Sequence, residues 1–283
     1  MVLAALIAAC GGSAAPSTSG SSAPAEPVAA TAVPDADHID HPTGSTDIVL
    51  RVAEEGGFMM TETVMARVPR FTLYGDGRVL ISTPAESAKA APGNGLSADV
   101  MRETHLTEDE VQAVLQSALV DGKVGIAKQE FPVMVMDVPT TVIELRAGGI
   151  EKRIAVAGLG MEPAPGPDAA VLRALAELVE RLVAIPTDGD YVAPASVAVL
   201  AQTEPAPGTA TTAWPWPDTE PQAFVPPPPE DQFGFTTHLL TAAESEAIGT
   251  APGEAAGPFT YDGPDSKTYV VVVRPALPEE VAA

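Results

Sequence analysis

Cysteine and positive charge are what this chain has least of. Cys10 is the only cysteine among 283 residues, so no disulfide can form within the chain. Lys and Arg number 15 against 38 Asp and Glu, which gives a formal net charge of −23. Nucleic-acid phosphates repel a protein of this charge. We therefore expect no nucleic-acid partner.

The motifs of common enzyme classes are also missing from the sequence. It contains no Gly-x-Ser-x-Gly or Ser-x-x-Lys motif of a serine hydrolase and no Walker phosphate loop. The sequence therefore predicts no catalytic residue and no cofactor.

Positive charge is unevenly distributed along the chain. No Lys or Arg occurs between Arg181 and Lys267, a stretch that holds 12 acidic residues. The 29 prolines and 24 glycines of the chain indicate long irregular stretches. We expect one domain before residue 186 and a proline-rich, acidic extension after it.

An apolar run opens the sequence and ends in Ile7-Ala8-Ala9-Cys10. Residues 1–9 are too few to span a bilayer, which takes about 20, and fit the apolar part of a signal peptide. A signal peptide also needs positive charge ahead of that part, but the first cation here is Arg51. We therefore expect the signal peptide to be truncated. The alternative is an ordinary cysteine after an unrelated apolar start.

The four residues that end in Cys10 resemble the lipobox of bacterial lipoproteins. This resemblance implies that the Cys10 thiol is acylated, that residues 1–9 are removed, and that acyl chains hold the protein on the extracytoplasmic face of the cell membrane. The residues that follow are mostly Gly, Ser, Ala, Thr and Pro, a composition that does not fold alone. We expect residues 10–46 to form a disordered tether.

Two hairpin–helix units are predicted between residues 47 and 185. The first has strands at 70–74 and 78–82 around Gly75-Asp76-Gly77, then a helix that the capping box Thr107–Glu110 starts. The second has strands at 140–146 and 150–156, then a helix with Asp168 as its cap. We expect an α+β fold, an antiparallel sheet with two helices on one face. Residues 48–52 and 60–68 add two further strands.

Residues 186–283 are predicted to be less regular. Proline-rich sequence fills 205–229, a capping box starts a short helix at Thr241, and residues 269–273 form an apolar strand. That strand needs a partner, so we expect the extension to pack back on the main domain. The expected parts are a signal peptide (1–9), a tether (10–46), an α+β domain (47–185) and the extension (186–283).

Short segments of the α+β domain resemble uncharacterised bacterial secreted proteins and lipoproteins. They are Phe71–Val79, Leu106–Glu110 and Asp137–Thr141. The resemblance implies a compartment and a fold, and no activity.

A cluster of histidines and carboxylates near the tether is a candidate metal site, because imidazole and carboxylate bind divalent ions. Its members are Asp35, Asp37, His38, Asp40 and His41. Their spacing matches no known metal motif, so we favour the alternative, a solvated acidic linker.

Trp214 and Trp216 lie between prolines. Exposed, they could bind a glycan or a partner protein. Packed on the sheet, they would fix an irregular segment, and we favour this second interpretation.

The leading functional hypothesis is a non-enzymatic envelope lipoprotein that binds an envelope protein or a glycan. The alternative is a secreted hydrolase or metal-dependent enzyme that uses His105 or His238 with acidic residues.

Overall fold

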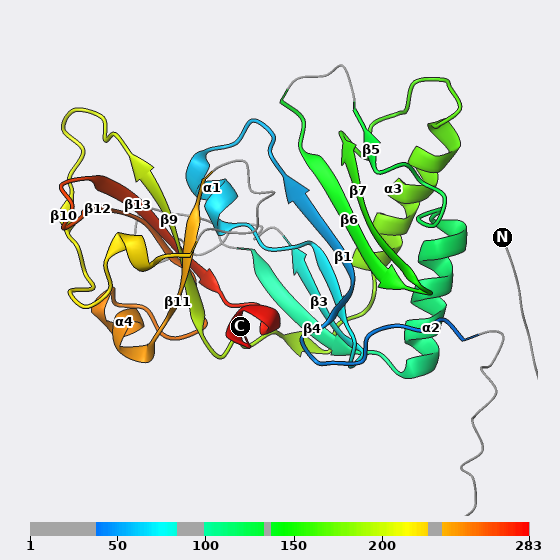
Figure 1. Ribbon diagram of the computed structural model, residues 1–283, viewed down its shortest axis with the longest axis horizontal. Helices are drawn as coiled ribbons and strands as arrows, with labels where there is room; N and C mark the ends of the chain where they lie inside the picture. The colour runs from blue at the N-terminus through cyan, green and yellow to red at the C-terminus, as the bar shows by residue number, and fades with distance from the viewer. Residues whose placement is uncertain (1–37, 84–98, 133–136, 226–233, 283) are drawn as a thin grey trace, which may run out of the picture. The chain divides into compact units, whose positions relative to one another are not determined.

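The computed structural model describes residues 38–83, 99–132, 137–225 and 234–282. Over these residues the fold is mixed α and β, with two mostly antiparallel sheets and five α-helices (Figure 1). The strands are β1 (Ile48–Glu55), β2 (Phe71–Tyr74), β3 (Arg78–Thr83), β4 (Val100–His105), β5 (Glu130–Phe131), β6 (Thr140–Ala147), β7 (Ile150–Ala157), β8 (Gly189–Asp190), β9 (Ser196–Thr203), β10 (Thr212–Ala213), β11 (Thr236–Leu240), β12 (Ala256–Asp262) and β13 (Thr268–Pro275). The helices are α1 (Thr61–Ala66), α2 (Glu108–Gln116), α3 (Ala169–Val183), α4 (Ala242–Ala247) and α5 (Pro278–Val281).

The larger sheet has the strand order β5-β7-β6-β1-β2-β3-β4-β8. Both predicted hairpins are confirmed, since β2 pairs with β3 and β6 pairs with β7. Gly77 in the first turn has φ of 86°, a conformation that glycine adopts without steric cost. Only the short β5 pairs in parallel, with β7.

Helices α2 and α3 pack against the larger sheet. Leu115 of α2 and Leu178 of α3 share one buried cluster with Leu50 of β1. The predicted capping box is confirmed, because Glu110 N donates to Thr107 Oγ1 and Thr107 N donates to Glu110 Oε2. The helix then continues as a π-helical turn to Asp121.

Asp168 is not the side-chain cap of α3 that the sequence predicts. Its Oδ2 instead accepts a hydrogen bond from Lys128 Nζ at 2.5 Å. The Asp168 carboxylate pairs with Lys128 instead of capping the helix. Lys128 lies 40 residues away in the sequence, so local spacing could not predict this pair.

Residues 186–283 contribute a sheet of their own, the smaller sheet, in the order β10-β12-β13-β9-β11. The predicted apolar strand is β13, and it pairs with β9 and β12 instead of joining the larger sheet. As a central strand it is buried on both faces. Val271 and Val273 lie in one apolar cluster, and Val272 lies in another on the opposite face. Burial on both faces explains why the strand is apolar throughout.

A short segment next to each sheet packs against the other sheet. Helix α1, between β1 and β2 of the larger sheet, packs Met65 and Ala66 against Val272 of the smaller sheet. In return, Leu277, which follows β13, packs against Tyr74 of the larger sheet. The predicted strand over residues 60–68 is therefore wrong, because this segment packs across the sheets as a helix instead of pairing within one.

Residues 38–46, which we assigned to the tether, lie against the folded unit. Ile39 N donates to Gln112 Oε1 at 2.7 Å, and Gln112 Nε2 donates back to Ile39 O at 3.0 Å. Gly148 N donates to Asp40 O at 2.7 Å. Among the described helices, none has the length and hydropathy that crossing a membrane requires.

Candidate functional site

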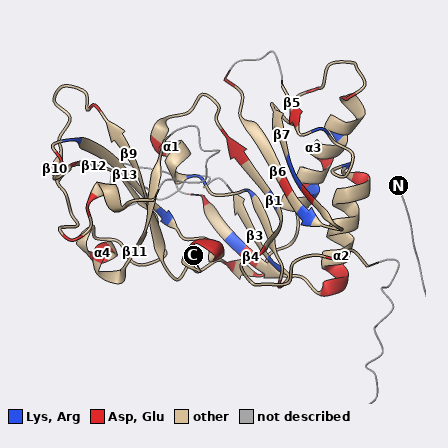
Figure 2. Ribbon diagram, in the orientation of Figure 1, with Lys and Arg blue, Asp and Glu red and all other residues tan. Residues whose placement is uncertain are grey.

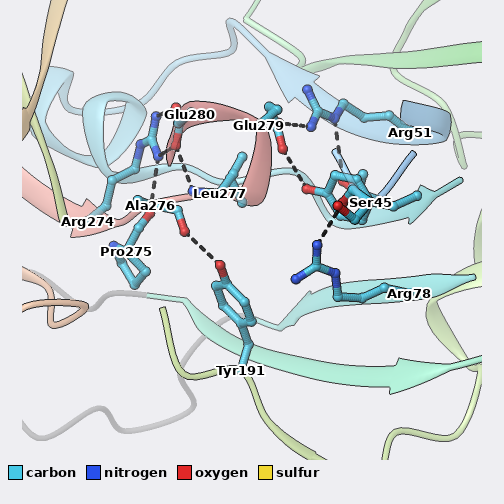
Figure 3. A network of polar contacts seen from close by, with 12 residues as sticks. Ser45, Arg51, Arg78, Tyr191, Arg274, Pro275, Ala276, Leu277, Glu279 and Glu280 are labelled. Carbon is cyan, nitrogen blue, oxygen red and sulfur yellow. Dashed lines mark hydrogen bonds and ion pairs between the residues drawn. The ribbon is translucent and has the colours of Figure 1, made fainter. Parts of the chain in front are cut away.

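A buried polar network joins α5 to the larger sheet (Figure 3). Glu279 of α5 accepts hydrogen bonds from the Arg51 guanidinium on β1 and from Tyr74 Oη on β2, the latter at 2.7 Å. The Tyr74 side chain is fully buried, and those of Arg51 and Glu279 are 16 % and 21 % exposed. The carboxylate therefore lies between a cation and a phenol in a site mostly shielded from water.

Arg51 and Tyr74 also have contacts within the larger sheet that do not involve α5. Arg51 lies opposite Thr72 in the β1–β2 register, and its Nε donates to Thr72 Oγ1 at 3.4 Å. The guanidinium of Arg78 lies over the Tyr74 ring, 5.2 Å from its centroid. Neither contact involves α5, so each restrains its side chain independently of that helix.

Burial and charge shift the pKa values of this network. Burial raises the pKa of Tyr74 far above its usual range, and the Glu279 carboxylate raises it further. Burial alone would lower the pKa of Arg51, but Glu279 outweighs it and holds that pKa above its ordinary value. Tyr74 therefore stays a neutral donor and Arg51 a cation at any physiological pH.

Helix α5 carries a second carboxylate, Glu280, whose partners lie within the same C-terminal segment. Glu280 accepts from Arg274 at 2.6 and 2.9 Å and from Leu277 N at 2.8 Å. Burial alone would raise the pKa of Glu280, but Arg274 outweighs it and holds the pKa below its usual range. Tyr191 Oη donates to Ala276 O at 3.0 Å.

The Glu279 carboxylate is held by an ion pair with Arg51, which already neutralises its charge, and by a hydrogen bond from Tyr74. Apolar side chains lie beside the polar pair, with Leu277 packed among Val68, Leu80 and Met101. We name this set the carboxylate socket; it consists of Arg51, Tyr74, Val68, Leu80 and Met101. No spacing rule joins Arg51 to Glu279, 228 residues apart, so the sequence analysis missed the socket.

The candidate metal residues are placed only in part. Asp35 and Asp37 lie outside the described residues. His38 and Asp40 are exposed, and the His41 ring lies 2.7 Å from Pro42 O and 3.2 Å from Glu108 Oε1. Over the described residues no three His, Cys, Asp or Glu side chains gather where they could hold a metal ion.

A shallow cavity of about 340 Å³ lies beside this segment. It is lined by Asp40, His41 and Pro42 and by the β6–β7 turn, where Arg146 and Glu151 form an exposed ion pair at 2.9 Å. The lining is open to solvent, and its Arg146 and Glu151 are paired with each other.

The two tryptophans pack into the smaller sheet. Trp216 is 2 % exposed, and its Nε1 donates to Glu244 O at 3.0 Å. Trp214 is half-buried, lies edge-on to Trp216 at 5.2 Å, and donates from Nε1 to Thr219 O at 2.7 Å. These contacts fix the proline-rich segment and occupy the polar atom of each indole.

The two isolated histidines have different surroundings. His105 is exposed at the end of β4. His238 Nε2 lies 3.1 Å from Glu244 Oε1, but this carboxylate also accepts from Thr219 Oγ1 and from Thr241 at the start of α4. Glu244 therefore caps a helix, and its pKa is low because these hydrogen bonds outweigh the effect of burial.

Cys10 lies outside the described residues. Comparison of the chain with models of protein families, with curated proteins and with solved structures gives no match. Its function is therefore inferred from its own residues.

Proposed function

We propose that this protein is a bacterial cell-envelope lipoprotein whose folded unit binds an envelope protein or a glycan and catalyses no reaction. Acyl chains on Cys10 hold it at the extracytoplasmic face of the membrane. The observation that carries the proposal is the lipobox-like Ile7-Ala8-Ala9-Cys10, which contains the chain's only thiol and precedes a Gly-, Ser- and Ala-rich segment. Two or more acyl chains anchor a protein stably, whereas one does not.

The surroundings of the titratable residues support binding over catalysis. Glu244, the partner of His238, accepts hydrogen bonds from Thr241 at the start of a helix. The Glu279 carboxylate accepts hydrogen bonds from Arg51 and Tyr74. A general base needs a free lone pair within reach of a substrate proton. The alternative of a hydrolase that uses His105 or His238 therefore has less support.

We also propose that α2 and α3 cover one face of the larger sheet. Leu50 and Val52, two residues apart on β1, point to the same side of the strand and share a cluster with Leu115 and Leu178 of the two helices. The opposite face carries Arg51 and so the carboxylate socket.

Metabolic labelling with an alkyne-bearing palmitate tests the anchor. The full chain is expressed in a bacterium behind a Met-Lys-Lys start, since export requires positive charge ahead of the apolar run. We expect the chain to carry label, to partition into detergent, and to begin at residue 10 by mass spectrometry. Cys10→Ala should lose all three properties, and Ser13→Ala should keep them. An unlabelled chain that retains residues 1–9 would contradict the proposal.

Photo-crosslinking on intact cells then tests the binding role. We expect one reproducible crosslinked species with the anchored chain that weakens in Cys10→Ala, because release from the membrane dilutes the protein. No crosslinked species under any growth condition would count against binding.

A further inference from the structure

The contacts of α5 with the two sheets differ in kind. Ala276 N donates to Ala195 O at 3.0 Å, and this bond connects the segment to the residue just before β9. Glu280 N donates to Leu277 O and Leu277 N donates to Glu280 Oε2, so these backbone groups are satisfied within the segment itself. Toward the larger sheet, the segment contributes the Glu279 and Leu277 side chains and the Ala276 carbonyl.

Undocking therefore breaks few bonds to the larger sheet. The Ala276 link to Ala195 then remains, but a free helix of four residues is marginal in water, so the Leu277 and Glu280 amides lose their hydrogen bonds and exchange with solvent. Elements held by few side-chain contacts open at a lower free energy than the sheets that carry the core.

The socket stays formed when α5 leaves. Arg51 keeps its contact with Thr72 and the nearby charge of Glu144, and Tyr74 keeps the overlying Arg78. The opened socket would present a cation, a phenol and an apolar floor. This combination fits a peptide in which a leucine precedes a glutamate by two residues, as Leu277 precedes Glu279.

We propose that Ala276–Val281 is a strap that closes the carboxylate socket reversibly while both sheets stay folded, and that the open socket binds a peptide with the chemistry of this same segment. The strap acts as an intramolecular competitor for the socket. This inference goes beyond the proposed function, because no step of it depends on the lipid anchor.

Hydrogen exchange on the full chain tests the opening. Under mild denaturant the strap amides should exchange faster than those of β9 and β13. Glu279→Gln should speed strap exchange by about tenfold or more, since a charge-assisted bond is lost, and leave the two strands unchanged. Glu246→Gln on α4 is the matched control and should alter neither. If strap and strands exchange together in every variant, opening is global and the proposal fails.

A labelled peptide of residues 274–282 tests the socket. We expect the full chain with Leu277→Ala and Glu279→Gln to bind this peptide at least about tenfold tighter than the unchanged chain, whose own strap occupies the site. The same peptide with its glutamate at 279 replaced by Gln should bind more weakly to the double variant. Equal binding by both chains, or no binding by either, would overturn the proposal. Circular dichroism of the double variant establishes that it is folded.

Discussion

The two sheets of this protein are stabilised by different side chains. The core of the larger sheet is mainly aliphatic and is shared with α2 and α3. On one face of the smaller sheet the core combines aliphatic residues with an aromatic cluster, and the core of the other face is mainly aliphatic. The members of the aromatic cluster are Trp214, Trp216, Phe224, Phe259, Tyr261 and Tyr269. Aromatic residues bury the most area per residue. A five-stranded sheet with one short helix, α4, against this cluster can therefore build a core from few side chains.

The sheets also differ in how their carboxylates are satisfied, because Lys and Arg are more frequent on the elements of the larger sheet than on those of the smaller sheet (Figure 2). On the larger sheet, cations pair with them, as Arg153 does with Glu55 at 2.7 Å and Arg70 with Glu54 at 3.3 Å. The smaller sheet has few cations, and hydroxyls take their place. Thr211 Oγ1 and Thr268 Oγ1 donate to Asp262 at 2.7 and 3.3 Å, and Tyr269 Oη donates at 2.7 Å to Asp265, which also pairs with Lys267 at 3.6 Å. Hydroxyl donors thus let an acidic region fold without matching positive charge.

Truncating a tryptophan should give the largest effect on this comparison. Trp216→Ala removes the most buried of the two indoles and should cost about 3–5 kcal/mol of unfolding free energy. Urea denaturation followed by circular dichroism measures it. Because α1, which connects β1 and β2 of the larger sheet, packs into a core of the smaller sheet, we expect one cooperative transition for both sheets.

Phe58→Ala is the control for this prediction, since Phe58 is 86 % exposed and should change stability by less than about 0.5 kcal/mol. A Trp216→Ala chain that unfolds in two separate steps would show that the sheets are independent.

Local patterns predicted some of the elements but not their assembly; residues 60–68 contain α1 instead of a strand, and β4, β11 and β12 were not predicted. The Gly75–Gly77 turn and both Thr capping boxes are set by residues within four positions, and the structure contains them. The second sheet depends on β13 pairing with β9, about 70 residues away, and the hydrophobic pattern alone does not name a partner. The socket depends on Arg51 meeting Glu279, which only the assembled sheets bring together. Cys10 was singled out by its local sequence alone, and that prediction still awaits its test.

Acid should weaken the smaller sheet through Glu244. Its pKa is lower in the folded protein than in the unfolded chain, so its stabilisation is complete above the unfolded value of about 4.3 and is lost as the pH falls through the folded value. Glu244→Gln should cost about 1–3 kcal/mol at pH 7 and should flatten the loss of stability below pH 4.3. Urea midpoints measured from pH 7 to pH 3 check this. Glu246→Gln, on the same helix, should leave the pH profile unchanged, and an identical profile for Glu244→Gln would refute the assignment.

The two capping boxes offer the smallest and most closely matched test. Glu110 N donates to Thr107 Oγ1 at 3.4 Å, and Glu244 N donates to Thr241 Oγ1 at 3.2 Å. Thr107→Ala and Thr241→Ala should each cost about 1 kcal/mol, because each leaves a backbone amide at a helix start without its acceptor. Thr→Ser at either position should restore most of the loss.

The caps differ in what else their glutamates contact. Among the described residues, the Glu110 side chain has hydrogen bonds with Thr107 alone, whereas Glu244 also accepts from Thr219 at 2.7 Å, a contact that survives the loss of the Thr241 hydroxyl. Urea denaturation of the two Ala variants should therefore show a loss for Thr241→Ala equal to or smaller than that for Thr107→Ala. A clearly larger loss at Thr241 would mean that hydroxyl donors in the acidic region act as one coupled network, in which removing one weakens the others.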